Sequence, residues 1–239
     1  VNYAFLLADE EEMTKAETFA IGITTALLIP ETAEKKERGD HAAIVHLTRQ
    51  VYRYSALFSI GACGIFVNFA EELGTMVYGS ADAARYTFLL GLLVPFMYLD
   101  TAVDALLKGM GEQVYTMKVN IADAASGLVL VCLLTPKLGI YGYLLTIWLC
   151  ELGNLRASIG RLGKLTGEGI RSAVRFCLVP GMICGILTAV RQIFLRCMPP
   201  FCAVLIFAVL YILCAYIFCT AENGKEKEKT GEISPVTAG

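Results

Sequence analysis

Acidic and amide side chains stand out inside apolar stretches of this 239-residue chain. Asp100 and Asp104 are four residues apart, so both lie on one face of a helix. Ionisable groups inside apolar helices are costly and usually face a cavity or a partner. In that setting a carboxylate can bind a cation or a proton. The residues that we expect to line such a cavity and to bind a coupling ion are Asp100, Asp104, Asn120, Asp123, Glu151 and Asn154.

These residues fall at similar depths if their three stretches cross a membrane in alternating directions. With a rise of about 1.5 Å per residue, Asp104 and Asp100 lie roughly 6 and 12 Å from Lys108, which marks the inner end of its helix. Asn120 and Asp123 lie roughly 9 and 14 Å from the inner end of the next helix. We therefore expect a polar cavity that opens toward the cytoplasm. The alternative is a simple pair between Lys108 and Asp104 near the interface.

Two more acidic residues, Glu71 and Glu72, lie in the outer half of a different apolar stretch. They are candidates for an outer gate. The alternative is that both carboxylates simply reach the membrane interface, where charge is tolerated.

Six apolar stretches would position all of these residues. A spanning helix needs roughly 20 mostly apolar residues. Hydrophobic residues make up 56% of the chain, charged residues 18%, and the mean hydropathy is +0.60, which excludes an ordinary soluble α/β domain. The fold predicted is all-α, a polytopic transmembrane helical bundle with a kink at Pro95. Its six full spans cover residues 55–78, 86–107, 114–135, 138–160, 173–195 and 201–220.

The 20 Lys and Arg residues are unevenly distributed between the two sides that these spans define. Most lie in the segment 31–53, in the turn at Lys108, in the segment 156–175 and in the C-terminal tail. Loops rich in Lys and Arg stay on the cytoplasmic side. We therefore expect a multi-pass protein of the cytoplasmic membrane with the 31–53 loop and the C-terminus inside.

The chain divides into three parts by composition. Residues 1–40 read as the end of a preceding segment, a leading helix over 14–30 whose uncharged part, 18–30, is too short to face lipid alone, and a charged inner loop. Residues 41–221 form the transmembrane helical part. Residues 222–239 are a charged tail that cannot bury a core and is expected to be disordered. Because the chain opens on Val1 within an apolar run, we expect it to continue a longer protein.

Signatures of other function classes are missing from the sequence. The nine cysteines show no CxxC or Cys/His spacing, so no metal site is expected, although Cys197 and Cys202 flank an outer turn and can pair in an oxidising compartment. There is no P-loop, GxSxG, HExxH or dinucleotide motif. We expect a protein that is not an enzyme, has no organic cofactor and binds no nucleic acid.

Several segments resemble a known family when they are taken in order. The segment 106–120 reads LLKGMGEQVYTMKVN, the segment 136–143 reads PKLGIYGY, and residues 151–155 read ELGNL. The segment 28–34, LIPETAE, resembles the end of a cavity-lining helix in polysaccharide exporters. Over residues 20–165 the chain resembles the stage V sporulation protein B branch of the multidrug/oligosaccharidyl-lipid/polysaccharide flippase superfamily, and the remainder is similar in topology.

The resemblance implies a flippase of two helical lobes, of which this chain is the C-terminal one with a leading cavity-lining helix. It implies alternating access, with an undecaprenyl-linked sugar or peptidoglycan precursor as cargo and Na⁺ or H⁺ as a coupling ion. The partners implied are membrane lipids and a missing N-terminal lobe. Arg53 and Arg156, near the inner rim, are candidates for contact with the lipid-linked phosphate. Two alternatives stay open: a membrane-embedded enzyme of cell-wall or polysaccharide synthesis, and a non-functional remnant of a truncated gene.

Overall fold

The computed structural model describes residues 27–78, 81–192 and 199–229, and every regular element within them is a helix. The prediction of an all-α fold is therefore confirmed for this part of the chain. A helix over residues 27–37 comes first. It is followed by α2 (His41–Asn68), α3 (Ala70–Tyr78), α4 (Ala81–Gly91), α5 (Val94–Gly109), α6 (Gln113–Leu138), α7 (Ile140–Thr166), α8 (Ile170–Val190) and α9 (Pro200–Lys229).

Three of these helices are long and apolar enough to cross a membrane: Gln113–Leu138, Ile170–Val190 and Phe201–Phe218. A bent pair, Ala83–Gly91 with Val94–Gly109, would make a fourth span. The described residues thus support three or four spans where the sequence predicted six. The predicted spans 55–78 and 138–160 do not reach the apolar length that a membrane span requires, because polar residues interrupt them. Within these two ranges the interrupting polar residues include Asn68 on α2, and Glu151, Asn154 and Arg156 on α7.

Two predicted spans are broken rather than continuous. The span 55–78 is interrupted at Phe69, where the preceding Asn68 donates a hydrogen bond from Nδ2 to the Gly64 carbonyl at 2.7 Å. The span 86–107 bends by 43° between α4 and α5. Pro95 lies in the first turn of α5, where a missing N–H is tolerated, so the bend falls just before the proline. The predicted kink is confirmed, and it takes the form of a break.

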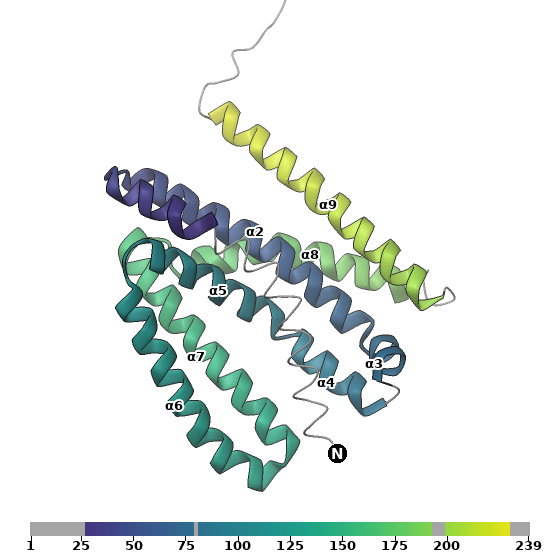
Figure 1. Cartoon of the computed structure of the whole chain (residues 1–239). Helices are drawn as coiled ribbons and strands as arrows, with labels where there is room; N and C mark the ends of the chain where they lie inside the picture. Colours follow the sequence, from purple (N-terminus) through teal and green to yellow (C-terminus); the bar gives the residue numbers. More distant parts are fainter. Residues whose placement is uncertain (1–26, 79–80, 193–198, 230–239) are drawn as a thin grey trace, which may run out of the picture.

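The main core forms where α2 and α5 pack together and α7 closes over them (Figure 1). Tyr52 of α2, Val103 and Leu106 of α5, and Leu162 of α7 are fully buried there. A second cluster joins Phe69 to α8 and α9, and a small third one joins α4 to α7. Apolar side chains of three different helices therefore fix the relative positions of α5 and α7, which carry most of the predicted cavity residues.

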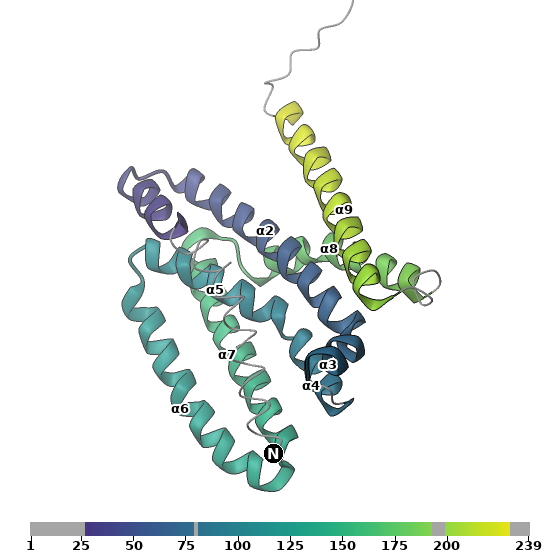
Figure 2. The ribbon, with the colours of Figure 1, turned by 45° about the vertical axis from the view of Figure 1, so that its right-hand side comes forward.

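Helices α6 and α7 form a tight antiparallel hairpin, in which α7 packs against α5 and α4 and α6 lies on the outside (Figure 2). Its turn is Gly139, which has φ of 60°, a backbone region that favours glycine. The two helices approach so closely that a Cβ on Gly142 would lie 2.5 Å from the Leu134 carbonyl oxygen. Thr116 is the buried residue of α6, the positions that face α7 are half-buried, and most of the others are exposed. Such a helix suits a lipid environment.

Two segment boundaries differ from the predictions. The charged segment after Pro30 continues as a helix to residue 37, because Glu31 and Glu34 form ion pairs with Lys35 and Arg38 one turn later. Helix α9 continues to Lys229, which is inside the tail expected to be disordered. Glu and Lys recur there at spacings of three residues, a pattern that supports a helix. The predicted leading helix over 14–30 lies mostly outside the described residues, and the tail beyond 229 lies outside them entirely.

Candidate functional site

The clearest polar contact in the core joins Asp100 of α5 to Asn154 of α7. Asn154 Nδ2 donates a hydrogen bond to Asp100 Oδ2 at 2.8 Å. Asp100 is only 7% exposed, and the apolar side chains of Val103 and Leu155 lie in the core around it. The Ser158 hydroxyl, one turn along α7, lies near the same carboxylate. Two of the six predicted cavity residues are thus brought together across a helix interface.

Asp104 has a different environment, one turn further along α5. Its Oδ2 lies 3.1 Å from Lys108 Nζ, so the two residues form an ion pair at spacing i, i+4. This geometry is the one that the alternative interpretation predicted for the pair. The Asp104 side chain is 13% exposed and that of Lys108 is 39% exposed. Asp104 therefore has a partner on its own helix, whereas Asp100 is bound from a neighbouring helix.

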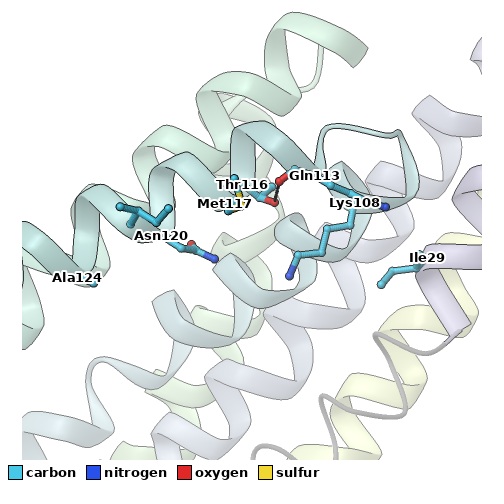
Figure 3. A pocket seen from close by; sticks show the side chains of 8 residues that line it. Ile29, Lys108, Gln113, Thr116, Met117, Asn120 and Ala124 are labelled. Atoms are coloured by element: carbon cyan, nitrogen blue, oxygen red, sulfur yellow. Dashed lines mark hydrogen bonds between the residues drawn. The ribbon is translucent and has the colours of Figure 1, made fainter.

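An open groove of about 490 Å³ runs beside this ion pair, between α6, the end of α5 and the helix over 27–37. Figure 3 shows the ammonium of Lys108 and the amide of Asn120 extending into it, with Ile29 on the opposite wall. Most of the lining surface is apolar. The residues that line the groove are Ile29, Lys108, Gln113, Thr116, Met117, Asn120, Ile121 and Ala124. The groove thus has apolar walls with cationic and amide groups along one part of them.

The other predicted cavity residues are less closely grouped. Asn120 lines the groove, and Asp123 lies half-buried on α6, near enough for its charge to act on Asp100. Glu151 is half-buried on α7, one turn before Asn154. The structure therefore joins Asp100 directly to Asn154, places Lys108 and Asn120 along one groove, and leaves Glu151 outside the groove lining.

The two predicted phosphate contacts lie in different environments. Arg53 is buried in α2, and its guanidinium carbon lies 5.2 Å from the centre of the Tyr54 ring. Arg156 is exposed on α7. They do not share a pocket with the groove residues.

At the far end of the bundle, the predicted gate residue Glu72 forms an ion pair with Arg191 of α8. The Arg191 guanidinium also lies 4.3 Å from the centre of the Phe69 ring. Glu71 is exposed, and both acidic residues line a second open groove of about 650 Å³ together with Arg85. Asn68 supports this end by donating from Nδ2 to Thr188 Oγ1 at 2.9 Å. The ion pair of Glu72 thus connects α3, in the second half of the broken span, to Arg191 at the C-terminal end of α8.

Three contacts were not predicted because they join residues that are far apart in the sequence. Arg161 of α7 binds both carboxylate oxygens of Glu112, with its Nη2 2.9 Å from each of them, at the start of α6. Arg49 binds Glu168, and Arg191 binds Glu72, each across 119 positions. No spacing in the sequence signals such pairs. Within the described ranges, no group of three or more His, Cys, Asp or Glu residues could hold a metal ion. Cys197 lies outside those ranges, so the predicted pairing with Cys202 stays a prediction.

Comparisons with known proteins found no match: no protein-family model, no curated protein and no solved structure is similar enough to this chain to report.

Proposed function

We propose that this chain is one lobe of a membrane flippase that moves a lipid-linked oligosaccharide or peptidoglycan precursor across the cytoplasmic membrane by alternating access. The cargo would be an undecaprenyl-linked sugar, and a second, N-terminal lobe would complete the cavity. The function proposed is transport, without a chemical change in the cargo. The observation that carries the proposal is the groove beside Lys108, which has an apolar wall and a polar, cationic edge.

The groove matches the chemistry of such a cargo. A lipid-linked precursor has an apolar tail and an anionic, hydroxyl-rich head group. Met117, Ile121 and Ala124 of α6 offer an apolar wall to the tail, while the ammonium of Lys108 and the amide of Asn120 can bind phosphate or sugar oxygens. Because α6 carries three or four turns of exposed apolar residues beyond the groove, the tail can stay in contact with lipid while the head group is bound.

Energy coupling is the second part of the proposal. A carboxylate buried between apolar helices is a functional-site hypothesis by default, because its desolvation costs free energy. Asp100, bound by Asn154, is such a group and lies one turn from the residue that pairs with the groove lysine. Binding of an ion at Asp100 would thus affect the groove through the shared helix α5.

A transport assay with matched tryptophan variants tests the proposal. The whole protein is reconstituted in liposomes, and movement of a fluorescent undecaprenyl-linked sugar between leaflets is measured. Ile121→Trp, which fills the groove, should slow transport at least tenfold. Val129→Trp, at an exposed position on the same helix outside the groove, should leave it unchanged. Equal rates in both variants would remove the groove from the mechanism, and chemical conversion of the lipid instead of movement would favour the enzyme alternative.

A further inference from the structure

Two buried oxygens at the contact between α5 and α7 lack a hydrogen-bond donor within the described part of the chain. They are Asp100 Oδ1 and Asn154 Oδ1. The other half of the same contact is complete, because Asn154 Nδ2 donates to Asp100 Oδ2 at 2.8 Å. Buried acceptors without donors are rare, and each one calls for an explanation. Here the two unsatisfied atoms belong to the two side chains that already share one hydrogen bond.

A single proton would satisfy both atoms. A primary amide and a carboxylic acid have complementary groups: the amide N–H donates to one acid oxygen, and the acid O–H donates to the amide oxygen. The first of these bonds is already present. The second requires a proton on Asp100 Oδ1, which converts the carboxylate to the acid and turns an acceptor into a donor.

We propose that Asp100 is a proton-binding site: Oδ1 takes up one proton and donates it in a hydrogen bond to Asn154 Oδ1, which closes a two-bond ring between α5 and α7. This inference rests on the proposed function in one respect, since it identifies the coupling ion as H⁺ rather than Na⁺. Protonation adds the second hydrogen bond between α5 and α7, and ionisation removes it.

The surroundings favour a proton over a metal ion. Hard cations take about six or more oxygen ligands, whereas the contact offers two unsatisfied oxygens among the apolar side chains of Val103, Leu155 and Ile159. Burying a carboxylate ion in such a place costs much free energy of desolvation unless its charge is compensated. An acid in a ring with an amide has no net charge to solvate, so a proton is the ligand that this pocket can accommodate.

The charged and titratable groups around Asp100 come from several helices. On α5, Asp104 and Lys108 form their own pair at 3.1 Å, and Asp123 on α6 adds a further negative charge. The hydroxyl of Ser158 on α7 lies near the carboxylate. Helix α2 also packs against α5, and its buried Arg53 has its guanidinium over the Tyr54 ring. The carboxylates of Asp104 and Asp123 oppose a negative charge on Asp100, whereas the Ser158 hydroxyl and the Lys108 ammonium favour it.

Infrared spectroscopy of the whole protein in liposomes tests the site without a transport assay. A protonated carboxyl group gives a C=O band that an ionised one lacks. We expect one such band in the wild type, its loss in Asp100→Asn and a shift in Asn154→Leu, which removes the partner. Asp104→Asn and Ser158→Ala should leave the band in place. A band that persists in Asp100→Asn, or one that disappears when K⁺ is replaced by Na⁺ at constant pH, would overturn the proposal.

Thermal unfolding across a pH series provides a second measurement. Asn at position 100 reproduces the ring of the protonated acid, since its amide can pair twice with Asn154. The unfolding midpoint of Asp100→Asn should stay constant over the alkaline range in which the wild-type midpoint falls. A variant midpoint below the wild-type one at every pH would instead favour a cation held by the carboxylate. If the protonated-carboxyl band is present but the liposome assay shows no lipid transport, the flippase proposal is wrong and the proton site stands. If lipid is transported but the band is absent, the proton site is wrong and the flippase proposal stands.

Discussion

Arg49 of α2 binds Glu168 in the turn between α7 and α8. Arg49 Nε lies 2.7 Å and a terminal guanidinium nitrogen 2.6 Å from Glu168 Oε1. Tyr52, one turn along α2, donates from its hydroxyl to the Glu168 backbone carbonyl at 3.0 Å. Glu168 is buried, with 8% of its surface exposed. This contact ties the central helix to the end of the α6–α7 hairpin.

Substituting Glu168→Gln should lower the stability of the protein. The change keeps the shape of the side chain but removes the charge that Arg49 binds, and hydrogen bonds to charged groups contribute about 1.5–3 kcal/mol before solvent screening at the exposed arginine is considered. We expect a loss of roughly 1–2 kcal/mol in the free energy of unfolding. Thermal unfolding in lipid or detergent measures it. Glu34→Gln is the control, because its ion pair with Arg38 is exposed and its loss should stay within about 0.5 kcal/mol.

The same contact predicts a dependence of stability on acid pH. Burial alone would raise the pKa of Glu168, but hydrogen bonds from Ser172 and Arg49 and the charges of Arg49 and Arg175 outweigh it and lower the pKa below its ordinary value of 4.5. Since the folded-state pKa is the lower one, the stabilisation is fully present above pH 4.5 and is lost as the pH falls through the folded-state pKa. Unfolding midpoints of the wild type and Glu168→Gln should therefore converge below pH 4.5, and a constant gap would contradict the assignment.

Gly142 should be intolerant of a side chain, whereas Gly153 on the same helix should accept one. A Cβ at Gly142 would lie 2.5 Å from the Leu134 carbonyl oxygen, an atom of the α6 backbone that cannot move without opening the hairpin. We expect Gly142→Ala to cost roughly 1–3 kcal/mol. No other atom lies within 4 Å of a Cβ at Gly153, so Gly153→Ala should be neutral or stabilise by up to about 1 kcal/mol through helix propensity. Denaturation of the two variants side by side makes the comparison, and equal midpoints would argue against the close approach.

Opposite ends of the α6–α7 hairpin should face opposite sides of the membrane. Lys137 is exposed near the end of α6, and Lys164 is exposed near the end of α7. In a background without other cysteines, Lys137→Cys should react with a membrane-impermeant thiol reagent in intact cells, and Lys164→Cys should react only after the cells are opened. The reverse pattern would invert the expected orientation, and labelling of both residues from outside would exclude a spanning hairpin.

Long apolar helices were the part of the fold that the sequence predicted well. The stretches 114–135, 173–195 and 201–220 correspond to α6, α8 and α9, because uninterrupted apolar length is a local property of the chain. Pro95 signalled the bend before α5 for the same reason. The break at Phe69 had no such signal, since Asn68 is held there by Thr188 from a distant helix.

The candidate site was only partly predictable. The spacing of Asp100 and Asp104 placed both on α5, and the spacing of Asp104 and Lys108 was enough to predict their pair. That Asn154 would reach Asp100 depends on how α5 and α7 pack, which is decided by Val103, Leu155 and other core side chains. The groove depends in addition on the helix over 27–37, where the sequence suggested a loop after Pro30.

Helix α6 contains 26 residues and buries little but Thr116. At about 1.5 Å per residue it is roughly 39 Å long, which exceeds the roughly 30 Å of hydrocarbon in a typical bilayer. Because α7 is its main protein neighbour, α6 can match the surrounding membrane by tilting together with α7. The hairpin will consequently tilt by different angles in thin and thick bilayers, and the width of the groove beside α6 will depend on the lipid composition.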